Sequence, residues 1–393
     1  MAYDPQLVTL LQLQRTPGVG ARTFHQLVAA FGSPDKVLSA ARPELLAVPG
    51  IGPKTAAAIR ESAQDTQAAE QELDRCEELG VCIVPFGHPQ YPPLLSQIPD
   101  PPALLYVKGT LLERDQLALA MVGSRQSTMY GRQVAERLSG ALARAGLTIV
   151  SGLARGIDSA SHRGALAAGG RTLAILGTGL ANIYPPEHVG LAEEIAQSGA
   201  VISEMPLDQV ATPGVFPLRN RIISGLSLGV LVVEANRNSG ALHTVRHATE
   251  QGREILAVPG RIDSLASEGC LDLLRDGAVL VRQADDVLET LGPLMQPVTV
   301  AVPRNDRAPR DTTGSLFSEP ETSATSSTIR QPRELTLNAM ERQVLDLVPA
   351  EAQSVDELLR GTTLEPSRVL ATLTILEMKR FVKRLPGGQV QRT

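Results

Sequence analysis

Residues 117–125 read LALAMVGSR, an apolar run that ends in Gly123, Ser124 and Arg125. The same pattern, an apolar run leading into small and polar residues and then into a helix-like stretch, recurs as far as residue 240. Apolar runs that alternate with helices in this way predict a parallel β-sheet buried on both faces. We expect its strands at residues 117–122, 147–150, 172–176, 200–202 and 228–233, with a further short strand at 103–107.

The residues that follow these strands predict a ligand pocket, because parallel α/β sheets bind ligands beyond the carboxyl ends of their strands. Glycines there let a ligand approach the backbone, and free amides at helix N-termini attract anions. Arginines such as Arg125 are bidentate, permanently charged phosphate ligands. This chemistry favours a ligand that carries phosphates.

Absent residue types narrow the function further. Residues 121–300 contain no lysine, which excludes the P-loop, Schiff-base and kinase-type lysines from this region. The Gly177-Thr178-Gly179 element lacks the third glycine of the dinucleotide fingerprint. The three cysteines do not cluster with histidine at zinc spacing. We therefore expect phosphate binding without phosphate chemistry, no cofactor and no metal.

Size and composition indicate a multi-domain cytoplasmic protein. The chain has 393 residues, 43% of them hydrophobic, and no apolar run approaches the length of a membrane span. The first residues lack the apolar stretch of a secretory signal, and three cysteines without pairing logic suit a reducing compartment. The net charge is −5, so nucleic-acid binding requires a local arrangement of residues and not a generally basic surface.

An internal repeat marks the N-terminal part. Pro17-Gly18-Val19-Gly20 and Pro49-Gly50-Ile51-Gly52 stand 32 residues apart, and each opens a helical pattern. This is the helix–hairpin–helix pattern, whose glycines form a tight turn that can aim backbone amides at a nucleic-acid phosphate. Arg22 and Lys54 favour that use. Packing or protein contacts alone are an equally open interpretation.

Composition divides the chain into four segments. We expect a helical domain at residues 1–90, a parallel-sheet domain at 91–292, a flexible linker rich in Pro, Ser and Thr at 293–333, and a C-terminal domain at 334–393. The last segment shows three amphipathic helices and then two short strands at 381–385 and 389–391, the pattern of a winged helix. Acidic and basic residues balance there, which favours protein contacts over groove reading, although both remain open.

The central motifs resemble those of the DNA-processing protein A family, also called DprA or Smf. The resemblance covers residues 91–289 and adds the two flanking domains in the family's order. The motifs that carry it include Val122-Gly123-Ser124-Arg125, Ser151–Asp158 with His162, Tyr184-Pro185, Ser203-Glu204, Phe216–Ser227, Val233-Glu234-Ala235 and Ser239–Thr244.

The resemblance implies a cytoplasmic protein of natural transformation that is not an enzyme. Such proteins bind and protect single-stranded DNA, help to load the RecA recombinase and form homodimers. It also implies an extended Rossmann-like domain whose Arg125 binds phosphate and whose Phe216 stacks on a base. The DNA contacts that we predict are Gly123, Ser124, Arg125, Ser151, Gly152, Arg155, Gly156, Phe216, Arg219, Asn220, Arg221, Ser239 and Gly240.

Some positions depart from the family or invite another role. Pro213 stands where some members carry a lysine, so Arg219 or Arg221 is expected to substitute for it. At least one of these two arginines is also expected to pair with an acid such as Glu204 or Glu234. Asp158 and His162, four residues apart on one helix face, are expected to form a structural pair.

Two other functions are each suggested by part of the sequence. The first is a nucleotide phosphoribohydrolase of the lysine-decarboxylase-like (LOG) fold, since Ser239–Thr244 occupies the place of that family's glycine-rich loop. That enzyme needs a glutamate just after the loop, and no carboxylate occurs here before Glu250. The second is an adaptor that binds proteins through its end domains, which leaves the phosphate pocket unexplained.

Overall fold

The computed structural model describes residues 3–292 and, beyond them, 344–349, 353–354, 358, 369, 372–373, 376, 381–385 and 389–392. The chain divides into two units, residues 1–296 and 297–393, and each is described by itself. Within the described residues, no helix is both long and apolar enough to cross a membrane. The expected linker at 293–333 lies outside the described residues.

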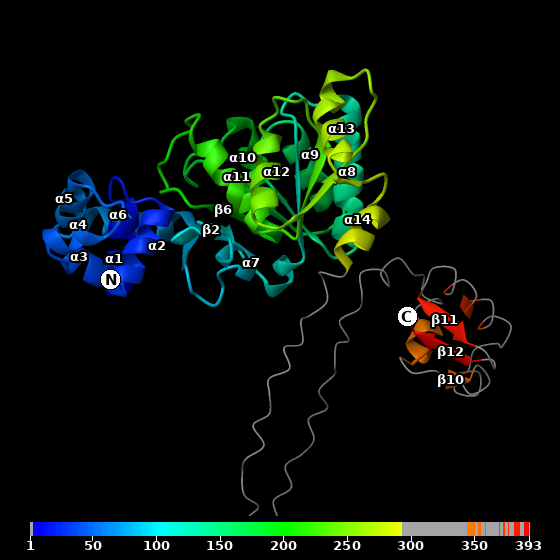
Figure 1. Cartoon of the computed structure of the whole chain (residues 1–393), viewed down its shortest axis with the longest axis horizontal. Helices are drawn as coiled ribbons and strands as arrows, with labels where there is room; N and C mark the ends of the chain where they lie inside the picture. Colours follow the sequence, from blue (N-terminus) through cyan, green and yellow to red (C-terminus); the bar gives the residue numbers. More distant parts are fainter. Residues whose placement is uncertain are drawn as a thin grey trace, which may run out of the picture. The chain divides into compact units, whose positions relative to one another are not determined.

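The first unit, coloured from blue to yellow in Figure 1, contains a sheet. Its nine strands have the order β1-β2-β6-β5-β4-β3-β7-β8-β9. Strands β3 to β9 run parallel to one another, and β2 pairs antiparallel with both β6 and β1. The predicted mostly parallel sheet is therefore confirmed. The strands are β1 (Val81–Pro85), β2 (Leu104–Gly109), β3 (Ala118–Gly123), β4 (Thr148–Ser151), β5 (Thr172–Leu176), β6 (Ala200–Ser203), β7 (Gly229–Glu234), β8 (Glu254–Ala257) and β9 (Val279–Leu280).

Three strands were not predicted. β1 lies before the expected domain boundary at residue 91, yet it pairs with β2 and forms one edge of the sheet. β8 and β9 form the other edge, and β9 has only two residues. All three are only partly buried. Residues 81–84 and 255–258 are nevertheless continuous apolar runs and were a usable signal for β1 and β8.

The strand order reverses at β3, which has β4, β5 and β6 on one side and β7, β8 and β9 on the other. A reversal of this kind leaves a crevice at the carboxyl ends of the strands beside it. The pairing of β3 with β7 shifts register between Val122 and Gly123, and the amide of Ser124 donates to the carbonyl oxygen of Glu234 at 2.7 Å. Arg125 therefore begins the connection that leaves the sheet at the reversal.

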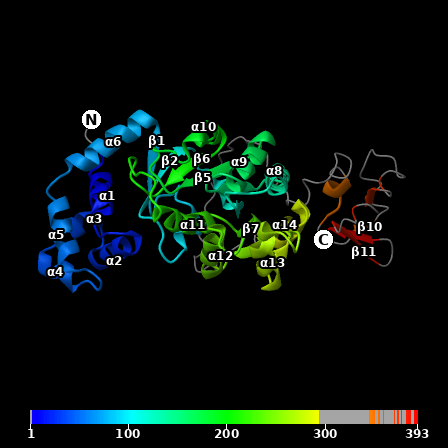
Figure 2. The same cartoon turned by 90° about the horizontal axis from the view of Figure 1, so that it is seen from above.

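Helices cover both faces of this sheet (Figure 2). Leu119 and Met121 of β3 pack under one set, whereas Ala118 and Ala120 face the other, which shows the two-residue alternation of a strand. The first set is α8 (Met129–Arg144), α9 (Ile157–Ala167), α10 (Val189–Ser198) and α14 (Ala284–Leu291), and the second is α7 (Pro93–Ser96), α11 (Val215–Gly225), α12 (Ala241–Glu250) and α13 (Glu268–Arg275).

Six helices precede the sheet and pack beside its β1 edge (Figure 1). They are α1 (Pro5–Arg15), α2 (Ala21–Phe31), α3 (Pro34–Ser39), α4 (Arg42–Ala47), α5 (Pro53–Ser62) and α6 (Gln67–Leu79). The two predicted hairpins join α1 to α2 and α4 to α5. Gly18 and Gly50 have φ angles of +87° and +85°, a conformation that side chains disfavour, so the turn requires glycine at both positions.

The second unit contains a three-stranded antiparallel sheet in the order β10-β12-β11. Its strands are β10 (Gln353–Ser354), β11 (Val382–Leu385) and β12 (Gln389–Arg392). The two predicted wing strands are confirmed, and β10 is an addition. Val344, Leu345, Leu358, Val369 and Leu373 belong to a shared buried core with Phe381 and Val390.

The predicted pair of Asp158 and His162 on α9 does not form. The Nδ1 atom of the fully buried His162 lies 2.7 Å from the hydroxyl oxygen of Thr172. That hydroxyl donates its proton to the carbonyl oxygen of Ile149, so it accepts from His162. Burial lowers the pKa of His162 to about 3, and the histidine is therefore neutral.

We expect this histidine to make stability depend on pH. Its pKa is lower in the folded protein than in the unfolded chain, so protonation below about pH 6.5 favours unfolding. The free energy of unfolding should fall by about 2 kcal/mol from pH 7 to pH 5 through this group alone. In His162→Asn, whose side-chain amide can still donate to Thr172, urea titrations should show a correspondingly shallower decline.

Ala160→Gly is the matched control for this experiment, since it destabilises the same helix without changing a titratable group. Its unfolding free energy should decline with pH as steeply as that of the native chain. An equally steep decline in His162→Asn would contradict the assignment.

Candidate nucleic-acid interface

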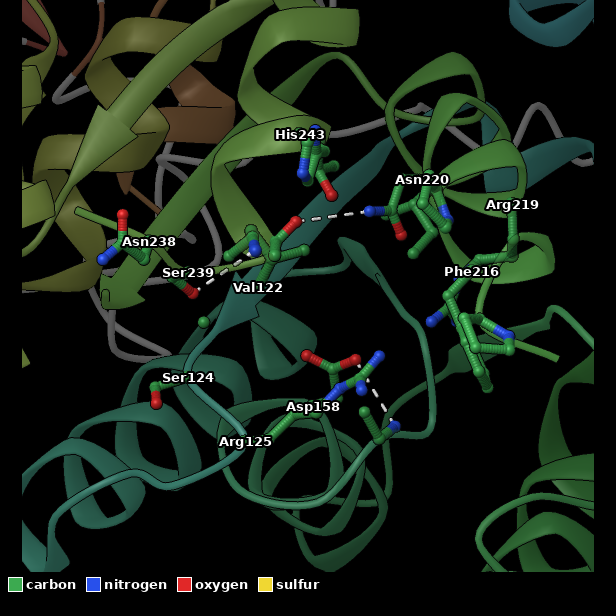
Figure 3. A pocket seen from close by; sticks show the side chains of 18 of the residues that line it. Val122, Ser124, Arg125, Asp158, Phe216, Arg219, Asn220, Asn238, Ser239 and His243 are labelled. Atoms are coloured by element: carbon green, nitrogen blue, oxygen red, sulfur yellow. Dashed lines mark hydrogen bonds between the residues drawn. The ribbon is translucent and has the colours of Figure 1, made fainter. Parts of the chain in front are cut away.

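A cavity of about 750 Å³ opens at the reversal of the strand order (Figure 3). Its walls come from the end of β3, the start of α9, the N-terminal half of α11 and the connection between β7 and α12. Eight of the predicted contact residues line this cavity. They are Gly123, Ser124, Arg125, Phe216, Arg219, Asn220, Ser239 and Gly240.

Arg125 presents a free guanidinium to the cavity. The side chain is exposed, and its Cζ atom lies 5.1 Å from the centre of the Phe216 ring, a cation–π distance. In the part of the chain that the structure describes, no carboxylate lies within ion-pair distance of Arg125. Its charge is therefore available to an anionic ligand.

Phe216 belongs to a small aromatic group. Its ring centre lies 5.7 Å from that of Tyr184, and the two rings are tilted by 48°. Tyr184 is 39% exposed and also lines the cavity. Tyr184 belongs to one of the sequence motifs but was not among the predicted DNA contacts. An aromatic residue that stays exposed beside a predicted pocket was the signal that could have identified it.

Arg219 is turned inward and holds a loop in place. Only 5% of this residue is exposed, and it donates to the carbonyl oxygens of Gly152, at 2.6 Å, and Ile175. Asp158 accepts from the amides of Gly152 at 3.2 Å and Ala154 at 3.4 Å. Both polar groups of the Gly152 backbone are thus fixed, and a side chain at Gly152 would collide with the Arg219 guanidinium.

Burial perturbs both charges of this arrangement. It lowers the pKa of Arg219 to about 10, although nearby Asp158 opposes the shift, so the guanidinium stays charged at neutral pH. Burial raises the pKa of Asp158, and Arg219 opposes that shift in turn. The two groups stabilise each other's charged forms across the loop that they hold.

Arg221 lies outside the cavity. Its guanidinium donates to both carboxylate oxygens of Glu204, at 2.8 and 2.5 Å, and lies 3.1 Å from Asp100. Of the two acids expected to pair with an arginine here, Glu204 does so. Glu234 instead accepts from the amide and hydroxyl of Thr128, at 2.7 and 2.6 Å. Arg221 therefore supports α11 and is not placed to contact a ligand in the cavity.

The remaining predicted residues surround the loop after β4. Ser151 is fully buried and donates to the carbonyl oxygen of Met121, so its hydroxyl is occupied. Gly152 and Arg155 border a small adjoining cavity of about 30 Å³, and Arg155 pairs with Glu187 at 2.5 Å. Gly156 precedes the first residue of α9 and lines neither cavity.

The opposite wall of the large cavity contains no Lys, Arg, Asp or Glu side chain. Asn220 donates to the carbonyl oxygen of Gly240 at 3.3 Å and so ties α11 to the start of α12. Asn236, Asn238 and His243 lie on the same wall, and Figure 3 shows Asn238 and His243 beside Ser239 and Asn220. These three side chains were not among the predicted contacts, although asparagines shortly after a buried strand were a usable signal.

The cavity has the groups for an anionic chain but shows no metal centre. Within the described residues, no three His, Cys, Asp or Glu side chains gather in a way that could hold a metal ion. Arg125 offers charge, Phe216 and Tyr184 offer aromatic surface, and the asparagine wall offers amides. These are the groups that hold the phosphates and bases of a nucleic acid.

Comparison with known proteins agrees with this arrangement. The family described as DNA recombination-mediator protein A matches residues 82–292, the DprA winged helix domain matches 329–388, and a SAM-like helix–hairpin–helix tandem matches 10–65. Protein Smf of Synechocystis is 38% identical over 320 residues, which cover 77% of this chain and 78% of that protein. The DNA processing protein DprA of Bacillus subtilis is 40% identical over 65% of this chain and 87% of its own length.

A solved structure supports the same relationship. The X-ray structure of DNA processing protein A from Streptococcus pneumoniae matches with a TM-score of 0.64 and 32% sequence identity, over 74% of this chain and 98% of that one. The family domain covers more than half of the chain, and the two flanking domains match in the expected order. The chain therefore belongs to the DNA recombination-mediator protein A family, as its sequence motifs had predicted.

Proposed function

We propose that this protein binds single-stranded DNA in the cavity beyond β3 and acts on it as a recombination mediator, without catalysing a reaction. The proposed setting is natural transformation in the cytoplasm, where the protein protects the incoming strand and helps to load the RecA recombinase. Family membership supports the proposal, since a recombination mediator must contact DNA. The resemblance of the motifs to those of the family supports single-stranded DNA as the ligand and RecA as the partner.

One observation carries the proposal: Arg125 is the cavity's available positive charge, and it lies against the ring of Phe216. Of the neighbouring arginines, Arg219 is engaged by backbone carbonyls, and Arg155 and Arg221 are engaged by carboxylates. A guanidinium beside a half-buried aromatic ring in the cavity wall matches the repeating unit of a single strand, in which a phosphate stands next to a base. Stacking of a base on an aromatic ring contributes about 1–3 kcal/mol.

The position of these groups favours a single strand over a duplex. Phe216 is half-buried in the wall of a cavity beyond the carboxyl ends of the strands, and Arg125 lines the same cavity. Bases of a duplex are stacked within the helix and reach such a cavity only after unpairing, which costs a few kcal/mol. Bases of a single strand are not paired, so they reach the cavity without this cost.

No observation favours the phosphoribohydrolase alternative. Among the described residues that line the cavity, Asp158 is the only carboxylate, and it accepts hydrogen bonds from two backbone amides. The Ser239–Thr244 loop has no glutamate behind it until Glu250, at the far end of α12. The groups needed to break a glycosidic bond are therefore not supplied by this wall.

We further propose a homodimer that brings two cavities onto one strand. A single cavity covers only a few nucleotides, and joining two raises affinity through effective concentration without new contacts. Two identical chains satisfy this most simply by an isologous contact. We place the contact on the first unit, since that unit holds the cavity and must fix the spacing between the two copies.

The first prediction concerns substrate choice. In anisotropy titrations, labelled oligo-dT should bind more tightly than a duplex of equal length, and sequence should matter little, since Arg125 and Phe216 read no base identity. The affinity should fall with salt only in proportion to the few phosphates neutralised. Equal affinity for the duplex at matched salt would refute the single-strand assignment.

The second prediction isolates the cavity. Arg125→Ala should weaken binding of single-stranded DNA by about 1.5–3 kcal/mol, the range for a hydrogen bond to a charged group. Arg144→Ala is the matched control, because it removes the same charge from an exposed site at the other end of α8. Its dissociation constant should match that of the native chain.

Removal of residues 334–393 completes this experiment. We expect the loss of affinity to be smaller than in Arg125→Ala, since the cavity lies wholly in the first unit. A larger loss would place the main DNA site in the C-terminal domain.

The third prediction concerns assembly. A shortened chain of residues 1–296, the whole first unit, should remain dimeric in light scattering and bind long single strands cooperatively. If this shortened chain is monomeric while the full chain is dimeric, the contact belongs to the C-terminal unit and the proposed placement is wrong.

A further inference from the structure

The helical N-terminal domain contacts one segment of the central domain through hydrogen bonds and an ion pair. The amide of Leu207 donates to the Oε1 atom of Glu72 at 2.8 Å, and the side chain of Gln14 donates to the carbonyl oxygen of Glu204 at 3.2 Å. Arg75 forms an ion pair with Asp208. These contacts all fall on residues 204–208, which follow β6 directly.

Glu72 is the buried member of this set. Only 4% of the residue is exposed, and its second carboxylate oxygen lies 2.5 Å from the guanidinium of Arg15. A buried carboxylate is costly unless it is both paired and hydrogen-bonded, and Glu72 is both. One oxygen thus satisfies the ion pair within the helical domain, and the other holds the backbone of Leu207.

Residues 204–208 are followed closely in the chain by residues that line the cavity. The carbonyl oxygens of Leu207 and Gln209 also accept hydrogen bonds. The donors are the amides of Ala181 and Gly179, which lie in the connection after β5. The next residues, 211–213, line the cavity, and Phe216 follows in the first turn of α11. Residues 210–214 are exposed, so the backbone bonds of Leu207 and Gln209 are the fixed points that precede the cavity wall.

We propose that Glu72 of the helical domain is a positioning residue for the DNA cavity. By fixing Leu207, it holds the 211–213 wall and the start of α11, so that Phe216 meets a base without prior ordering. This inference rests on the proposed function, because it takes single-stranded DNA as the ligand. It gives the helix–hairpin–helix domain a role in binding that requires no DNA contact of its own.

The test measures single-strand affinity in three variants of the full chain. Glu72→Ala removes the acceptor for Leu207 and should weaken oligo-dT binding by about five- to tenfold, since the freed segment must be ordered on binding. Glu72→Gln keeps a neutral acceptor and should restore most of the affinity. Arg15→Met breaks the same ion pair but leaves the bond to Leu207, so it should lower the melting temperature while the affinity stays unchanged.

Hydrogen exchange supplies a readout that does not depend on DNA. In the free protein, the amide of Leu207 should exchange faster in Glu72→Ala than in the native chain, and not in Glu72→Gln. If Glu72→Ala does not fold, Arg75→Ala removes the neighbouring exposed contact to Asp208 and should produce a smaller loss of affinity in the same direction.

The outcomes separate this inference from the proposed function. If the native chain fails to bind oligo-dT, the proposed function and the positioning role of Glu72 are both refuted. If the native chain binds but Glu72→Ala binds equally well, only the positioning role is overturned. An affinity loss in Arg15→Met or in Glu72→Gln as large as that in Glu72→Ala also overturns it, since binding would then follow the stability of the junction and not the hold on Leu207.

Discussion

Glu234, at the end of β7, is the residue on which the geometry of the site depends. Its carbonyl oxygen accepts from the amide of Ser124, and its carboxylate accepts from the amide and hydroxyl of Thr128. One residue therefore holds both ends of the short connection that carries Arg125. The carboxylate also lies at the N-terminus of α8, where the helix dipole stabilises a buried negative charge. Glu234 itself does not line the cavity, so its negative charge shapes the connection without facing the cavity.

Three carboxylates near the cavity, of which Glu234 and Asp158 are buried and Glu204 is half-buried, have similar structural roles. Glu234 fixes the loop after β3, Asp158 fixes the loop after β4, and Glu204 holds Arg221 under α11. Each is satisfied by amides, a hydroxyl or a guanidinium, so none presents an unpaired negative charge to the cavity. Arg125 consequently keeps its full charge available, and a chain with a net charge of −5 can still attract a phosphate locally.

The architecture could be predicted because its signals are strong and local. Apolar runs at the central strands, paired glycine turns in the hairpins and motifs in family order each specify structure without knowledge of the rest. The edge strands β1, β8 and β9 were not predicted; they are only partly buried, and their pairing depends on neighbours distant in sequence.

The site itself was less predictable than the fold. Arg219 and Arg221 are two positions apart on one helix, and the sequence alone could not decide which faces the cavity. The structure turns Arg219 onto a backbone loop and Arg221 onto two acids, so neither takes the simple ligand role. Such choices depend on where carbonyls and carboxylates of other elements lie, which spacing along one helix cannot encode. The Asp158–His162 pair failed for the same reason, because Thr172 and the Gly152 backbone offered better partners.

This separation of roles has a consequence for how the site tolerates change. Residues that shape the cavity are buried and mutually dependent, so substitutions there alter folding and binding together. Arg125 and Tyr184 are exposed and carry few protein contacts, so substitutions there leave the fold intact. Pro213, where the motif resemblance led us to expect a lysine, is also exposed, so the scaffold does not depend on a lysine there. In the proposed function, the charge available to DNA is that of Arg125, and the buried residues around it fix the position of the connection that carries it.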